Sequence, residues 1–215
     1  MNVVEIAATF LTVFVLHMHI KYHVLTSNEL VLHRMESPPT AKLNRYCDTR
    51  QPIVFLAPLV GVDSLKPGIT LSNRKLTSNY CNGSFYMAPY GTLVTNHLVT
   101  APSEQIYKDH CYRHYVCALG NNAKVVLWPP TLAEDVPWIL ENKRLGHCVS
   151  ESALPTKGSM NLTLKTNEGL FIPSAWAYKI TESTGVLHMY YYTPMNLLAN
   201  VRLRVPRVLP DLFGL

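Results

Sequence analysis

The chain has 215 residues, enough for one ordinary domain or two small ones. Hydrophobic residues make up 48% of it and charged residues 15%, a composition that supports a packed core and argues against global disorder. The formal charge of +5 is spread along the chain and forms no basic stripe, so nucleic acid is not an expected partner.

An apolar run over residues 6–16 is the first feature in chain order. It has the length of a signal-peptide core and falls short of the roughly 20 apolar residues that a membrane span needs. We therefore predict a signal peptide over residues 1–27, with cleavage near Ser27, although Glu5 stands where a positive charge is usual. A buried first helix and an uncleaved anchor that reaches Ile20 are the alternatives. A cleaved product would have no stable transmembrane anchor of its own.

Two glycosylation sequons agree with entry into the secretory pathway. They begin at Asn82 and Asn161, and both match the N-x-[ST] pattern without proline in the middle. Such sites are modified only if the chain reaches the lumen of the endoplasmic reticulum. Together with the apolar run, they predict a secreted or surface-bound glycoprotein.

The chain has five cysteines: Cys47, Cys81, Cys111, Cys117 and Cys148. Pairing within the chain therefore leaves at least one of them without a disulfide. In an oxidising compartment, any four of them can form two bridges in three different pairings. We expect Cys111 and Cys117 to pair with each other. The odd cysteine then either stays buried as a thiol or forms a bridge to another chain.

Most of the chain after the leader has the composition of β-strands. A polar, extended lead-in covers residues 35–50 and a long loop covers residues 61–80. Aromatic and β-branched residues, with period-two alternation in places, predict the strands. We place them at residues 53–60, 84–90, 92–100, 112–118, 124–128, 160–165, 170–181, 185–193 and 197–205.

One helix is predicted, over residues 132–145. It follows a capping box from Thr131 to Glu134, its acidic residues lie at its start, and Gly146 is a natural stop. The predicted class is therefore mainly β (α+β), with antiparallel strands and one short helix. We divide the mature chain into a disulfide-containing N-terminal β part, residues 28–122, and a second part, residues 123–215, with the helix and further strands.

No pattern in the chain predicts catalysis. The common nucleophile, phosphate-binding and metalloprotease motifs are absent, and no two carboxylates stand at a spacing typical of acid–base work. Cys111, His114 and Cys117 have zinc-ligand spacing, but they lack a second pair apart from His147 and Cys148. We therefore expect no metal, no cofactor and no enzyme. A hydrolase that uses Ser, Cys or a metal is the alternative, with a pocket where His110, His114 or His147 meets Cys or Ser.

Tyrosines near the end of the chain predict an interaction surface. Tyr190 and Tyr192 share one face of a strand, and Tyr is enriched at protein interfaces because it combines apolar area with a polar tip. Arg202 and Arg204 share one face of the last predicted strand. We take these four residues as interface candidates.

The segment from Cys81 to Val94 resembles part of a cytomegalovirus envelope glycoprotein, the chemokine-like subunit of the pentameric entry complex. The shared pattern is a cysteine followed at once by a sequon, then spaced tyrosines and a Gly-x-Thr-Leu-Val strand. Cys47 with the tyrosine before it, Tyr192 and residues 201–203 are similar to further parts of that family. The resemblance implies a chemokine-like N-terminal part, assembly with glycoproteins H and L, and a host receptor as a further partner.

These features together predict a secreted or virion-surface glycoprotein that acts as a subunit of a viral entry or receptor-binding complex. The alternative is a secreted immune-modulatory protein that works alone and captures a host chemokine or another ligand. Both would belong to the secretory pathway, so the sequence does not separate them.

Overall fold

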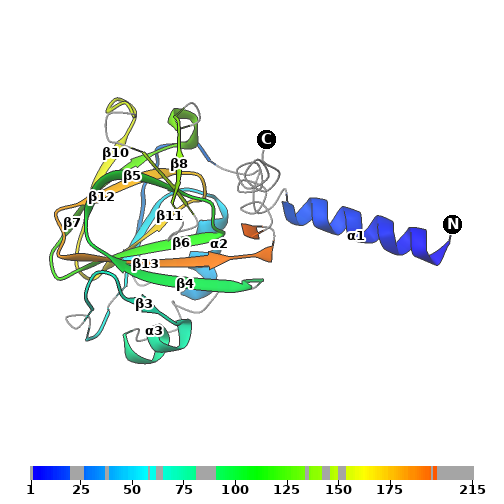
Figure 1. Cartoon of the computed structure of the whole chain (residues 1–215), viewed down its shortest axis with the longest axis horizontal. Coiled ribbons are helices and arrows are strands. Elements are labelled where there is room, and N and C mark those ends of the chain that lie inside the picture. Colours follow the sequence, from blue (N-terminus) through cyan, green and yellow to red (C-terminus); the bar gives the residue numbers. More distant parts are fainter. Residues whose placement is uncertain are drawn as a thin grey trace, which may run out of the picture.

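A computed structural model of the chain describes residues 2–19, 27–36, 39–57, 59–61, 65–80, 91–133, 136–141, 146–149, 154–194 and 196–197. The predicted mainly β class is confirmed, because two large and predominantly antiparallel sheets form the body (Figure 1). The one parallel pair described is β1 with β2.

Thirteen strands make up the two sheets. The first sheet has seven, in the order β1 (His33–Met35), β2 (Ile53–Leu56), β11 (Glu168–Ile172), β6 (Arg113–Leu119), β13 (Gly185–Tyr192), β4 (Val94–Thr100) and β3 (Thr70–Leu71). The second has six, in the order β10 (Met160–Leu164), β7 (Ala123–Trp128), β12 (Ala177–Thr181), β5 (Ser103–Asp109), β9 (Gly146–Val149) and β8 (Ile139–Glu141).

Strands from the two predicted parts of the chain alternate within both sheets. In the seven-stranded sheet, β11 lies between β2 and β6, and β13 lies between β6 and β4. Within the described residues, a boundary at residue 122 therefore does not separate two folding units. The expected chemokine-like N-terminal part is likewise not a unit of its own, since its strands depend on C-terminal ones for pairing.

An apolar core fills the space between the sheets. Strand alternation supplies it: Val125 and Leu127 of β7 and Leu162 and Leu164 of β10 point inward, whereas Lys124, which precedes Val125, is exposed. Side chains from the seven-stranded sheet meet them, including those of β6, β11 and β13. Burial of this size is the main favourable term in folding, at about 25 cal/mol per Å² of apolar surface.

The other face of the seven-stranded sheet is also covered. Helix α2 (Thr40–Asp48) contributes Leu43 and Cys47 to a second core, and α3 (Asn73–Asn79) contributes Leu76. Every residue of β6 and β13 is therefore buried, which explains why these strands do not alternate between apolar and polar residues. A smaller cluster around Trp128 and Leu154 covers part of the outer face of the six-stranded sheet.

The prediction of a helix at residues 132–145 is wrong. A short 3-10 helix, η4 (Pro130–Leu132), occupies its start, and the chain then forms a hairpin of β8 and β9, in which Ile139 pairs with Cys148. Pro137 has no backbone N–H and disfavours a helical residue before it. Pairing of β9 with β5 stabilises the extended alternative.

Other boundaries also differ from the predicted ones. The lead-in at residues 35–50 contains α2, and the loop at residues 61–80 contains β3 and α3, which begins where the Ser72 hydroxyl accepts from the Lys75 backbone N–H. The strand expected at residues 170–181 is two strands, β11 and β12, separated by a turn. Strand β5 was not predicted. The strand at residues 84–90 lies outside the described residues, as does most of the one at 197–205, although Leu197 itself is helical.

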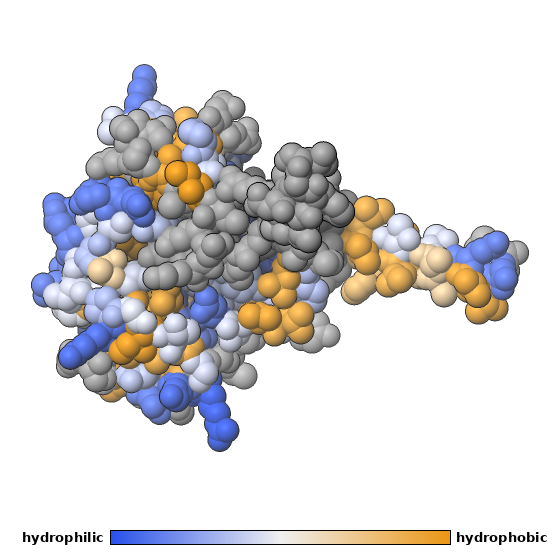
Figure 2. Space-filling model, in the orientation of Figure 1, coloured by the Kyte–Doolittle hydropathy of each residue, from blue (hydrophilic) through white to orange (hydrophobic). Residues whose placement is uncertain are grey.

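The apolar run near the N-terminus is a helix, α1 (Val3–His19), which stands apart from the sandwich and has a largely apolar surface (Figures 1 and 2). Its large side chains are exposed, with Phe10 at 73% and Phe14 at 60%. Among the described residues, no helix combines the length and the hydropathy of a membrane span. Downstream, the chain is attached to the body: the indole N–H of the buried Trp176 donates to the Ser27 carbonyl oxygen at 3.1 Å.

Candidate functional site

Cys47, Cys111 and Cys117 are buried, and none of the three forms a disulfide. The predicted Cys111–Cys117 bridge is wrong. Cys117 lies within β6, whose first residue, Arg113, is already about 13 Å away at the usual rise of about 3.3 Å per residue, and Cys111 lies before that strand. A disulfide needs Cα atoms roughly 4.4–6.8 Å apart. Burial raises the pKa of Cys47 to about 11 and that of Cys111 well above its ordinary value.

The remaining cysteines are described only in part. Cys81 lies outside the described residues, and for Cys148 the structure gives the backbone, in β9, but not the side chain. The fold does not support the zinc alternative, because His114 and Cys117 are three residues apart on an extended strand and their side chains point to opposite faces. Over the residues that the structure describes, no three or more His, Cys, Asp or Glu side chains are placed to hold a metal ion.

The predicted tyrosine interface is wrong for Tyr190 and Tyr192. Both are 0% exposed and pack with Cys111, so neither offers a surface to a partner. Tyr191 points the other way, into the core beneath the helices. Asn82, Arg202 and Arg204 lie outside the described residues, whereas Asn161 is exposed on β10, an edge strand of the six-stranded sheet.

Tyr190 instead belongs to a buried polar cluster between the sheets, which we call the histidine cluster: Thr100 (β4), Asp109 (β5), His114 (β6), Tyr178 (β12), His188 and Tyr190 (β13). Tyr190 and His114 are direct register partners across β13 and β6. His114 stacks on Tyr190 with ring centroids 4.4 Å apart, and on His188 at 5.2 Å. The rings of both histidines are almost fully buried.

Hydrogen bonds connect the members of the histidine cluster. Nε2 of His114 lies 3.0 Å from Nδ1 of His188, whose Nε2 lies 3.2 Å from the Thr100 hydroxyl. On the opposite side, Nδ1 of His114 lies 3.5 Å from Oδ2 of Asp109, which accepts from the Tyr178 hydroxyl at 2.5 Å. The cluster therefore extends from a buried carboxylate on one sheet to a half-buried hydroxyl on the other.

The chemistry available to the histidine cluster is proton binding. It contains an imidazole pair and a carboxylate, but the residue at its outer end is a threonine beside a cavity of only about 10 Å³, close to the space of one water molecule. A substrate does not fit there. The sequence analysis placed Tyr190 and Tyr192 on one strand face, but it did not indicate that β6 would bring His114 against Tyr190 and His188.

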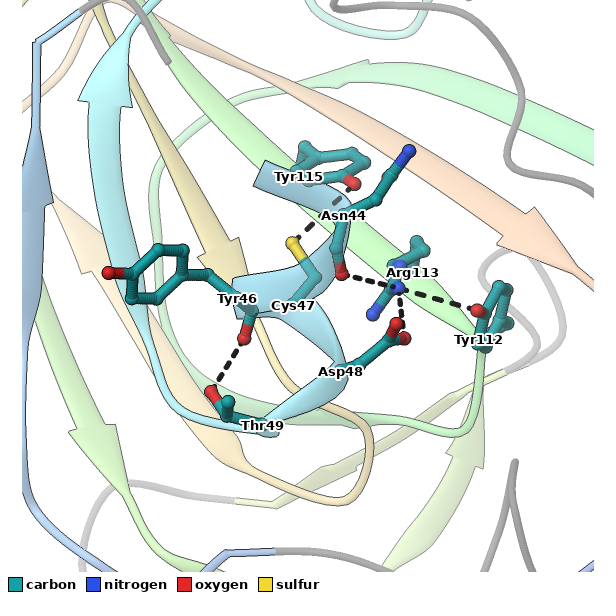
Figure 3. A network of polar contacts seen from close by, with 8 residues as sticks. All are labelled: Asn44, Tyr46, Cys47, Asp48, Thr49, Tyr112, Arg113 and Tyr115. Atoms are coloured by element: carbon teal, nitrogen blue, oxygen red, sulfur yellow. Dashed lines mark hydrogen bonds and ion pairs between the residues drawn. The ribbon is translucent and has the colours of Figure 1, made fainter. Parts of the chain in front are cut away.

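A second polar network attaches α2 to the seven-stranded sheet (Figure 3). Arg113, 1% exposed, donates from Nη2 to Oδ1 of Asp48 at 2.6 Å and to the Asn44 carbonyl oxygen at 3.3 Å. Its guanidinium group lies 4.5 Å from the centroid of the Tyr112 ring. Sγ of Cys47 lies 3.8 Å from the Tyr115 hydroxyl, so this thiol belongs to the same interface. The network has a structural role, since its groups contact one another.

An open cleft of about 780 Å³ lies at the β1 edge of the seven-stranded sheet. Arg34 of β1 and Glu168 of β11 form an ion pair across it at 3.1 Å. Lys165 and Glu36 add one further charge of each sign. The charges of these four lining residues cancel, and among the described residues of the cleft no nucleophile is seen paired with a base.

No protein-family model matches the chain, and no relative is found among curated proteins. Among solved structures, the chain is similar to hydroquinone 1,2-dioxygenase from Sphingomonas sp. TTNP3 with 4-hydroxybenzoate bound, at 13% identity over 50% of this chain and 68% of that one. It is also similar to the hydroquinone 1,2-dioxygenase PnpCD in complex with Cd2+ and 4-hydroxybenzonitrile, at 16% identity over 51% of this chain and 63% of that one. Both superpositions have a TM-score of 0.30, so we draw no conclusion from them about fold or activity.

Proposed function

We propose that this chain is a non-catalytic glycoprotein of the secretory pathway that acts as a subunit of a virion-surface complex, together with glycoproteins of the H and L type and a host receptor. The proposal takes its partners from the resemblance to the cytomegalovirus entry subunit. Its placement in the secretory pathway has support from the residues described below.

The geometry of the Asn161 sequon is the main support. Asn161 and Thr163 are both exposed on β10, while Leu162 between them is buried in the core. Strand β10 is at an edge of its sheet, where it pairs with β7. A glycan on Asn161 would therefore extend into solvent without displacing any part of the core.

Helix α1 gives independent support. Phe10, Leu11 and Phe14 are each at least 60% exposed, so the helix leaves apolar surface that the sandwich does not cover. Exposed apolar surface of this extent is typical of a segment that is recognised by another molecule or removed. A signal peptide satisfies both conditions.

The buried thiols narrow the choice of cysteines for a bridge to a partner. Cys47, Cys111 and Cys117 are at most 1% exposed and are therefore inaccessible to another chain. Within our proposal, a covalent link to the complex would use Cys81 or Cys148.

The first experiment is expression of the full chain in human cells, with glycosidase digestion and mass spectrometry of the product. We expect Asn161→Gln to abolish one glycosidase-sensitive shift in mobility. Asn121→Gln is the matched control, because Asn121 is exposed in a turn but is not in a sequon. A product that stays in the cytosol, unglycosylated and with its first methionine retained or processed only at that residue, would rule out the proposal.

The second experiment tests the partners. The chain is co-expressed with cytomegalovirus glycoproteins H and L, and the complexes are separated by affinity purification and non-reducing electrophoresis. Co-purification, with loss of any covalent species in Cys81→Ser or Cys148→Ser, is expected. A glycosylated product that is secreted as a monomer and ignores both glycoproteins would refute the subunit role and favour a modulator that works alone.

A further inference from the structure

His114 and His188 share a single hydrogen bond between their rings, in a space closed by both sheets. We propose that this pair is an acid-sensitive switch: it accepts one proton with its contacts intact, and a second proton separates the sheets around it. The inference concerns the described fold and is independent of the proposed viral function.

The neutral pair has one arrangement of hydrogen atoms that satisfies its neighbours. The Thr100 hydroxyl donates to Nε2 of His188, Nδ1 of His188 donates to Nε2 of His114, and Nδ1 of His114 faces the Asp109 carboxylate. Three of the four ring nitrogens are then hydrogen-bonded, and Nδ1 of His114 lies within ion-pair distance of the carboxylate without a hydrogen bond. No water molecule is needed inside the cluster.

A first proton fits into this arrangement. It binds Nε2 of His188, and the Thr100 hydroxyl rotates so that its oxygen accepts. The hydrogen bond between the rings is unchanged. The positive charge is compensated by Asp109 at the other end of the cluster, whose Oδ2 lies 3.5 Å from His114.

A second proton does not fit. It would have to bind Nε2 of His114, which lies 3.0 Å from a nitrogen that already donates. Two donors would then face each other, and two imidazolium rings would stack with centroids 5.2 Å apart inside the protein. Like charges at this distance and low effective dielectric repel strongly.

Other ionisable groups facing the pair do not relieve this conflict. Asp109 of β5 is the acidic group, and it already accepts from the Tyr178 hydroxyl of β12. Tyr190 of β13 stacks on both histidines through its ring. Cys111 lies two residues before β6, and the Asp109 carboxylate adds to the effect of burial in raising its pKa, so this thiol stays neutral.

Protons have a route to the pair without unfolding. The cavity of about 10 Å³ is lined by Thr100, Ser103 and His188, and Thr100 is half-buried at its outer side. One water molecule in this space would connect solvent with Nε2 of His188. The switch can therefore respond to pH in the folded protein.

The sign of the pH dependence follows from counting protons. Below about pH 6.5, the ordinary pKa of histidine, the unfolded chain binds a proton on each of the two residues, while the folded chain binds at most one on the pair. Folding is thus opposed by acid. The folding equilibrium constant should fall about tenfold for each pH unit once both unfolded residues are protonated.

The test uses the full chain with His97→Gln as the parent, because burial lowers the pKa of His97 to about 4 and this residue would add its own pH dependence. Urea unfolding of the parent is measured at pH 7.5 and at pH 5.0. The pair should lower the folding equilibrium constant about 30-fold between these two pH values. In the His97→Gln/His188→Gln double variant, that part of the fall should disappear. Glutamine can donate to His114 or accept from it, so the ring contact is replaced in either protonation state.

Equal falls in the parent and in the double variant would overturn the proposal. If the double variant does not fold at pH 7.5, the titration of the histidine ring protons of the parent by NMR decides instead. Uptake of a single proton by His114 and His188 together, above the pH at which the fold is lost, is expected. Independent titration of both residues in the folded protein would refute the switch. Neither measurement depends on glycosylation or on partner proteins. Failure of the acid-sensitive switch can therefore be distinguished from failure of the proposed function.

Discussion

Replacement of Gly169 by alanine is a sharp test of the packing between β2 and β11. An added Cβ atom would lie 2.5 Å from Cε2 of Phe55, closer still to Cζ, and 3.0 Å from Cβ of Ala57. Ordinary contacts between such atoms are about 3.5–4.0 Å. Phe55 and Ala57 are each 1% exposed, and the Phe55 ring is held edge-on by Tyr115 at 6.1 Å, so it has little room to move. We expect a loss of about 1–3 kcal/mol in the free energy of unfolding, the usual cost of overpacking.

Urea unfolding followed by circular dichroism measures this loss. Gly185→Ala is the matched control, because an added Cβ there meets its nearest neighbours at 3.6–3.8 Å and should change stability little. In a Phe55→Leu background, the ring atoms that clash are absent, so Gly169→Ala should cost less than half of its effect in the natural chain. Equal effects at Gly169 and Gly185, or no relief by Phe55→Leu, would contradict the described register of β2 and β11.

Three further predictions concern charges and thiols. Burial keeps His97 neutral in the folded protein with a pKa of about 4, so stability is lost as pH falls from about 6.5 towards 4. Between pH 7 and 5, urea titrations should show that the natural chain loses about 2 kcal/mol more than His97→Gln does, and equal losses would show that His97 is not responsible. Asp48→Asn should lower the free energy of unfolding by about 1–2 kcal/mol, a figure kept small because Asp48 is half-exposed and solvent screens its charge. In an Arg113→Met background the same substitution should leave the free energy of unfolding unchanged, and an equal loss in both backgrounds would show that the ion pair is not responsible. In native protein at pH 8, Cys47 and Cys117 should resist a thiol reagent that labels them fully in urea, and rapid labelling of either would show that it is not buried.

Sequence periodicity predicted the strands that have one face towards the core and one towards solvent. Strand β10 is the clearest case, since its apolar residues point into the sandwich and Asn161 points out. Strands β6 and β13 were predicted from their aromatic and β-branched content instead. Because successive side chains of a strand point to opposite faces, Tyr190 and Tyr192 were placed on one face correctly, but this did not show that helices cover the other face.

The short helices could not be predicted because their stability is tertiary. In α2 the buried apolar residues Leu43 and Cys47 are only four apart, and apart from Ala41 and Tyr46 the rest of the helix is polar, so the segment has the composition of a loop. Helices this short are marginal by themselves. The opposite error occurred at residues 132–145, where local capping signals suggested a helix but Pro137 and pairing with β5 favoured a hairpin.

The candidate site was recognised only in fragments. Tyr190 and Tyr192 were predicted to share a strand face, and His114 was considered as a zinc ligand between two cysteines. His114 and His188 are 74 positions apart in the chain, and the pairing of β6 with β13 brings them together. Register between distant strands is set by the whole sheet, and no local pattern encodes it.

The hydrogen bond from Trp176 to Ser27 limits where a leader peptide can be removed. The indole of Trp176 is 0% exposed, so cleavage after Ser27 would take away the acceptor of its N–H and leave a stranded donor, at a cost of about 1–3 kcal/mol. Cleavage before Ser27 keeps that carbonyl in the mature chain. Within the proposed function, the mature N-terminus should therefore be Ser27 or an earlier residue, because an aromatic side chain almost 150 residues downstream needs the Ser27 carbonyl oxygen as its acceptor.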